Sequence, residues 1–146
     1  WWLPPGKRKL YFKASLKMPN TYYNLPGLIL VADRGSLDVF AVKGSQKPNL
    51  KTELYRAPFH NTAQEGDVCL GSAGDRKKRE EITAEMARME KIFFNTRFTH
   101  GGDGNVAKGL NINLVLMDAI KAPFKEKDLA ISKYKTVEGL IKKYSK

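Results

Sequence analysis

The sequence has few of the residues that cross-link small domains or bind metals in them. Its 146 residues include one cysteine, Cys69, and two histidines, His60 and His100. A single cysteine cannot form an internal disulfide, and these three residues do not make a structural zinc site. We therefore expect no metal and no cofactor. Without a disulfide to indicate an oxidising compartment, a cytoplasmic location is the default expectation.

Long hydrophobic runs are also missing. No stretch approaches the roughly 18 apolar residues that a membrane span needs, and no signal peptide is visible, so we expect no membrane association. Apolar residues make up 42% of the chain and charged residues 28%, which is ordinary for a soluble globular protein. The sequence opens with Trp1 and not with methionine, so we expect a single domain, residues 1–146, cut from a longer protein.

Acidic residues are absent from the first 20 positions, and this shapes the net charge of +11. Residues 1–20 carry five basic side chains, and residues 121–146 carry eight lysines against three acids. The hundred residues between them are nearly neutral. The basic ends are either lysine-rich surfaces that aid solubility or docking surfaces for an acidic partner. Nucleic acid is a possible partner of this kind but is not the favoured one.

The first half of the chain has the pattern of an antiparallel sheet. Four β-prone segments are separated by short turns, at residues 9–14, 28–32, 37–42 and 52–57. The second and third flank the tight turn Asp33-Arg34-Gly35-Ser36, which predicts a hairpin. Short links between successive strands predict a four-stranded antiparallel meander.

The second half has helical periodicity. Apolar residues recur at helical spacing at Ile82, Met86, Met89 and Phe93. They predict an amphipathic helix with Asp75 as its cap and residues 76–79 as a basic first turn. Residues 110–120 are apolar nearly all round and predict a short, well-buried helix. Residues 121–146 predict a basic C-terminal helical segment, which ends in an amphipathic turn or two at residues 137–144. A sheet followed by helices is an α+β fold.

The cysteine lies in a polar loop directly after the last predicted strand. Asn61 precedes Cys69 by eight positions, and Gly66 precedes it by three. A thiolate can accept an acyl group and pass it on, and an amide side chain such as that of Asn61 can stabilise the oxyanion that forms. A lone cysteine is usually an inert core residue, and Asn61 alone is most simply a turn residue. Their spacing favours catalysis.

The segment Pro58–Gly71 resembles the active site of the ubiquitin-conjugating enzymes. In that family an asparagine lies eight residues before the catalytic cysteine, within Gly-x-Ile/Val-Cys-Leu, and the matching residues here are Asn61, Gly66, Val68, Cys69 and Leu70. The stretches "WWLPPGKRKLYFK", "LYRAPFHN", "VCLGSA" and "FFNTRFTH" resemble the bacterial branch called prokaryotic family D, which includes the PRTRC system protein B.

This resemblance implies a ubiquitin-conjugating (UBC-like) fold and a thioester on Cys69. The partners that it implies are a ThiF-like adenylating activating enzyme, a ubiquitin-like protein and a target protein. Asn61 would stabilise the oxyanion or brace the loop, Gly66 and Gly71 would let the backbone pass close to the ubiquitin-like tail, and Leu70 would pack beneath the loop.

The sequence departs from the family pattern in three places. The proline between the histidine and the asparagine is absent, because the chain runs Phe59-His60-Asn61. His60 is therefore either a loop brace or an acid–base helper. The first helix of the family has no counterpart before residue 9, so that helix is lacking or displaced. The tryptophan shortly after the cysteine is also missing.

The remaining site residues leave alternatives open. His100 follows the predicted end of a helix, where it either approaches Cys69 or interacts with the helix dipole. Asp103, in a glycine-rich loop, either shapes the approach of an acceptor or is a turn residue. The catalytic candidates are thus Cys69, Asn61, His60 and His100. Two other functions compete with the transferase: a cysteine hydrolase using Cys69, His100 and an asparagine, and a non-catalytic module that binds a ubiquitin-like protein or nucleic acid.

Overall fold

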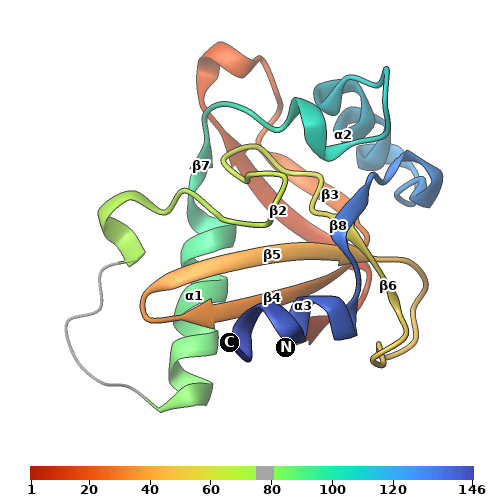
Figure 1. Cartoon of the computed structure of the whole chain (residues 1–146). Coiled ribbons are helices and arrows are strands. Elements are labelled where there is room, and N and C mark those ends of the chain that lie inside the picture. The colour runs from red at the N-terminus through yellow and green to blue at the C-terminus, as the bar shows by residue number, and fades with distance from the viewer. Residues whose placement is uncertain (75–80) are drawn as a thin grey trace.

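The computed structural model describes residues 1–74 and 81–146, and its strands largely precede its helices (Figure 1). The strands are β1 (Trp2–Leu3), β2 (Gly6–Phe12), β3 (Thr21–Leu25), β4 (Gly27–Asp33), β5 (Ser36–Val42), β6 (Glu53–Arg56), β7 (Arg97–Phe98) and β8 (Ile131–Thr136). The helices are α1 (Ile82–Asn95), α2 (Ile112–Lys121) and α3 (Val137–Tyr144). This arrangement confirms the predicted α+β fold.

The centre of the predicted meander is confirmed. Strands β4, β5 and β6 are antiparallel neighbours, with Asp33 opposite Ser36 at the end of the β4–β5 hairpin. The two residues of its turn, Arg34 and Gly35, have φ values of 49° and 87°. Positive φ at both central positions is the geometry that matches the twist of two antiparallel strands.

The first predicted strand pairs differently from the expectation. It is β2, and it pairs with β3, which the sequence pattern did not indicate, and not with β4. The short β1 pairs with β4 instead, in the same register, since Trp2 lies opposite Ile29 and Gly6 lies opposite Leu25. The pairing is interrupted at Pro4 and Pro5 on one strand and at Pro26 on the other. Proline has no N–H to donate, so this long hairpin is divided between two sheets.

The two sheets are a five-stranded one, in the order β1-β4-β5-β6-β8, and a three-stranded one, in the order β3-β2-β7. Helix α3 covers one face of the larger sheet and α1 the other (Figure 1). The α3 face has its own small core, whose buried residues are Ile29, Phe40, Val42, Leu54 and Leu140. Strand β8, which directly precedes α3, was not predicted.

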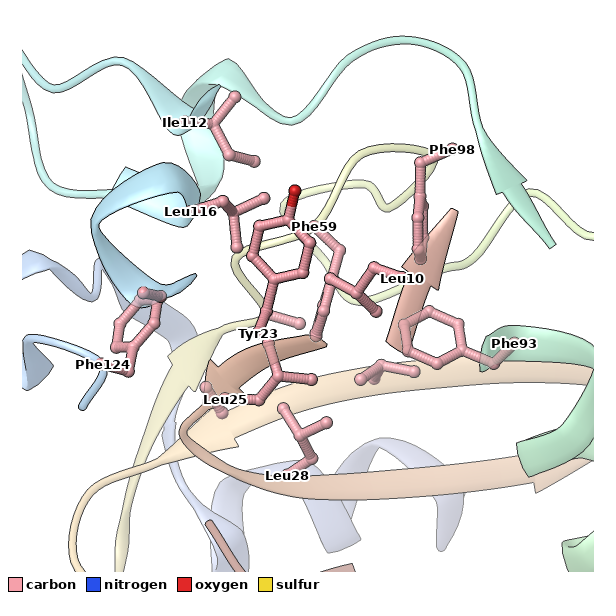
Figure 2. Packing of buried hydrophobic residues seen from close by; sticks show 14 of the residues in the cluster. Leu10, Tyr23, Leu25, Leu28, Phe59, Phe93, Phe98, Ile112, Leu116 and Phe124 are labelled. Carbon is pink, nitrogen blue, oxygen red and sulfur yellow. The ribbon is translucent and has the colours of Figure 1, made fainter. Parts of the chain in front are cut away.

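The main core holds the loop that carries the cysteine (Figure 2). Phe59, two residues before Asn61, is fully buried, stacked on Phe98 with ring centroids 5.8 Å apart and edge-on to Phe93 at 5.1 Å. Full burial of an aromatic side chain contributes about 2–3 kcal/mol to stability. Phe59 therefore anchors the start of this loop against both α1 and β7.

Helices α1 and α2 differ in part from the sequence prediction. Met89 and Phe93 are buried on α1 as expected, and the helix begins at Ile82; Asp75 and residues 76–79 lie outside the described part of the chain. The predicted short helix is present as α2, but the expectation that it is well buried holds for one face only. One face of α2 packs against β3. On the opposite face Leu114 is 65% exposed and Met117 is 44% exposed. None of the helices in the described residues is long and apolar enough to cross a membrane.

Candidate functional site

The loop between β6 and Cys69 folds back on itself, which gives the eight-residue spacing its structural meaning. Asn61 N donates to His100 O at 2.8 Å, and Cys69 N donates to Asn61 O at 2.8 Å. Thr62 and Val68 form an antiparallel bridge within the loop. The backbone of Asn61 thus joins two segments: its N–H bonds to the segment after β7, and its carbonyl accepts from Cys69.

The Asn61 side chain braces this arrangement. Its Oδ1 accepts from Thr99 N and Thr99 Oγ1, both at 3.0 Å, and from His100 N at 3.2 Å. Its Nδ2 donates to Arg97 O at 3.3 Å. Asn61 has φ 55°, and asparagine tolerates this left-handed conformation better than most residues. The amide oxygen is fully used, whereas Nδ2 has a second N–H to offer.

Cys69 is exposed and lines a hollow of about 390 Å³ at the surface. Asn61, Asp67, His100 and Asn105 line the same hollow. The structure therefore brings together three of the four predicted catalytic residues, Cys69, Asn61 and His100. No cluster of three or more His, Cys, Asp or Glu side chains that could hold a metal ion is found within the described ranges.

His60 is not part of this hollow. It is 2% exposed, its Nε2–H donates to Asn113 Oδ1 at 2.8 Å, and its ring lies edge-on to Phe12. Burial lowers the pKa of His60, although the hydrogen bond to Asn113 and the charge of Asp103 act in the opposite direction. A buried neutral imidazole that ties the loop to α2 fits the loop-brace alternative better than the acid–base one.

The depressed pKa of His60 makes stability depend on pH. In the unfolded chain His60 binds a proton near its ordinary pKa of 6.5, whereas in the fold it stays neutral to lower pH. The unfolded state binds more protons, so this contribution to stability is present above about pH 6.5 and is lost as pH falls, by up to about 1.4 kcal/mol per pH unit. Urea unfolding at pH 7.5 and 5.5 should show a larger loss for the native chain than for His60→Gln; equal losses would contradict a neutral buried His60.

His100 lies at the rim of the hollow and not at a helix end. Helix α1 ends at Asn95, and β7 separates it from His100, so the helix-dipole alternative is wrong. The His100 ring is exposed, and its Nδ1 is 2.6 Å from Thr99 Oγ1. Asp103 begins a short 3₁₀ turn, Asp103–Asn105, and is not among the residues that line the hollow.

Gly66 has a different role from the expected one. It is buried with φ 103°, and a Cβ built on it would lie 2.8 Å from Cε1 of Phe40. A glycine is needed here because the Phe40 ring occupies the space that a Cβ would take, and not because a bound peptide passes close by. Gly71 has φ 55° with open space around it, so its predicted role in admitting a tail stays a prediction. Leu70 packs partly buried against the core, as predicted.

Two residues of the hollow, Asp67 and Asn105, were not predicted from the sequence. Asp67 is two positions before Cys69 in extended chain, a spacing that places alternate side chains on one side. That alternation is visible in the sequence only if the segment is known to be extended. Asn105 reaches the hollow through the fold of the loop after β7, for which the sequence carried no signal.

An exposed cysteine on a loop that an asparagine braces from eight positions earlier, beside an antiparallel sheet, is the arrangement expected of the E2-like, or ubiquitin-conjugating-like, class. Residues 1–131 match the family model described as Prokaryotic E2 family D, and the chain belongs to this family. No curated protein and no solved structure matches it. Membership confirms the predicted family and indicates a ubiquitin-conjugating-like role.

Proposed function

We propose that this protein is a carrier enzyme that accepts a ubiquitin-like protein as a thioester on Cys69 and transfers it to a target. The activating partner is an adenylating enzyme, which presents the modifier as an acyl group. The Cys69 thiolate attacks the acyl carbonyl carbon, the activating enzyme's own sulfur leaves, and the acyl group remains on Cys69 Sγ. The exposed thiol on the asparagine-braced loop is the observation that carries this proposal, and family membership supports it.

Asn61, His60 and His100 have separate roles in this proposal. The Asn61 oxygen holds the loop, and the second N–H of its Nδ2 donates to the oxyanion that forms when the carbonyl is attacked. His60 ties the same loop to α2 from below. His100 stands at the rim of the hollow, where an acceptor enters.

A test that needs no natural partner uses a fluorescent peptide with a C-terminal glycyl thioester. The native protein should acquire the label in an adduct that excess thiol removes. Cys69→Ala should acquire none, and Cys69→Ser should give a thiol-resistant ester, because oxygen replaces sulfur. A native protein that stays unlabelled, or an equal adduct on Cys69→Ala, would defeat the proposal.

Hydrolysis is the second candidate, because His100 shares the hollow with Cys69. A hydrolase would release free peptide acid from the labelled protein with multiple turnovers in plain buffer. A carrier should hold its label in buffer and release it when an amine is added. The rate of label loss without amine distinguishes the two functions.

A further inference from the structure

A groove lies between the edge of strand β2 and helix α1, away from the hollow of Cys69. Its volume is about 460 Å³, and it shares no lining residue with that hollow. The side chains that matter below come from both elements: Lys7, Arg8 and Lys9 of β2, and Glu90, Lys91 and Phe94 of α1. The basic stretch of residues 1–20, to which the proposed function gives no role, thus forms one wall of a groove.

The edge of β2 that borders this groove has open backbone groups. Strand β3 pairs along one side of β2, whereas on the other side β7 begins only opposite Tyr11. Lys13 N donates toward β7, to Phe98 O at 2.9 Å. Residues two apart on a strand direct their N–H and C=O groups to the same edge, so those of Lys7 and Lys9 point this way too, beyond the start of β7. An extended peptide can add to such an edge as a further strand.

The charge of the groove indicates which peptide would fit. Among the described residues that line it, Glu90 is the one acid, and it already pairs with Arg8 at 3.6 Å. The exposed side chains of Lys7, Lys9 and Lys91 have no ion pair within the described ranges. Lysines on a strand edge deter pairing with a neutral or basic strand. The groove therefore favours an acidic one.

The two faces of β2 set the order of side chains that such a strand needs. Leu10 is fully buried in the main core, so Arg8 belongs to the same inner face, where its guanidinium lies over the Phe94 ring, 4.9 Å from the centroid. Lys7 and Lys9 belong to the outer face. Side chains of an added strand lie opposite those of β2 on each face. Acidic residues thus fit opposite the two lysines, and an apolar residue between them fits beside Phe94.

We propose that this groove is a docking site for an acidic, extended peptide segment of a partner protein, which adds to β2 as a strand and alternates acidic with apolar residues. The inference does not depend on the thioester chemistry of Cys69. Nucleic acid is the poorer match, because its phosphates could contact the lysines but it has no peptide backbone to pair with the strand edge. The basic residues of β2 then serve as a docking surface and not only as an aid to solubility.

The first test measures binding of a short fluorescein-labelled peptide that alternates glutamate with valine, by fluorescence polarisation at low salt, where charges are least screened. We expect saturable binding to the native chain. The double variant Lys7→Glu/Lys9→Glu should bind about 10-fold more weakly, because attractive cross-strand pairs become repulsive. The matched control Lys121→Glu/Lys127→Glu reverses two exposed lysines elsewhere, with the same change in net charge, and should bind like the native chain.

A second set of probes separates strand addition from attraction between charges alone. One peptide has the same composition with its glutamates contiguous, and another has an N-methylated backbone. Each keeps the charge but loses the alternation or the N–H groups, so we expect about 10-fold weaker binding of both. Hydrogen exchange at the amides of Lys7 and Lys9 should slow when the alternating peptide is bound.

Four results would overturn the inference. They are the absence of saturable binding to the native chain, an equal loss in the two double variants, equal affinity for the three peptides, and unchanged exchange at Lys7 and Lys9. A single-stranded oligonucleotide of the same charge should bind more weakly than the alternating peptide. Tighter binding of the oligonucleotide, lost in Lys7→Glu/Lys9→Glu, would assign the groove to nucleic acid instead.

Discussion

Replacing Asn61 with alanine should slow acyl transfer through Cys69 by about 100- to 1000-fold, the loss expected when an oxyanion donor is removed. The substitution also removes the four side-chain hydrogen bonds to Arg97, Thr99 and His100. At about 0.5–1.5 kcal/mol each, their loss should destabilise the fold by about 2–4 kcal/mol. Rates of label transfer from the peptide thioester and urea unfolding would measure the two effects.

Two further variants separate the two roles of Asn61. Asn61→Asp keeps an oxygen that can accept from Thr99 and His100, but it has no N–H for an oxyanion. If oxyanion donation matters, this variant should be nearly as slow as Asn61→Ala. If only bracing matters, it should transfer at nearly the native rate, which would contradict the donor role. Asn61→Gly fits φ 55° without strain, so its difference from alanine isolates the backbone cost, about 1–2 kcal/mol.

Substitution of Gly66 with alanine should have the larger effect on stability. The residue has φ 103°, and its added Cβ would collide with the Phe40 ring. Backbone strain and overpacking each cost about 1–3 kcal/mol, so we expect a loss of about 2–5 kcal/mol in the free energy of unfolding. Because Val39 N bonds to Gly66 O, the loop of Asp67 and Cys69 should shift as well, and labelling of Cys69 should slow.

Gly71 provides the matched control for this experiment. It also has positive φ, at 55°, but no atom lies within 4 Å of the place that an added Cβ would take, so Gly71→Ala should cost only about 1–2 kcal/mol of strain. Adding Phe40→Leu to Gly66→Ala should recover part of the loss by removing the collision. If the two alanine variants are equally stable, the contact with Phe40 is not what requires Gly66.

The strands that the sequence predicted are those whose signal is local. Residues 28–32 and 37–42 form a continuous apolar run and its return around a turn that favours positive φ, and both are strands in the fold. Strand β3 was missed because it is enclosed by Pro19 and Pro26, and β8 because its Ile-Ser-Lys-Tyr-Lys-Thr sequence has little apolar content. Each is a strand because of its partner, β2 or β6, and that pairing is a tertiary property.

The candidate site likewise has features that a local sequence pattern predicts and features that depend on distant residues. The spacing of Asn61 and Cys69 could be predicted because both belong to one loop that closes on itself within eight residues. The placement of His60 toward α2 depends on Asn113, more than 50 positions later, and no local pattern indicates it. The antiparallel bridge of Asp38 and Asp67 depends on the register between a strand and a loop, and the ion pair of Asp38 with Lys143 depends on a helix at the far end of the chain.

The small core under α3 bears on where this protein can be cut. Phe40 and Leu54, both fully buried, are roofed on that side by Leu140, and the same Phe40 ring fills the space that Gly66 leaves open. A version shortened to residues 1–131 would lack Leu140 and expose Phe40 and Leu54 to solvent. The packing of the Phe40 ring beneath Gly66 and the reactive loop would then be weakened. The last fifteen residues thus support the segment of Cys69 indirectly, through Phe40.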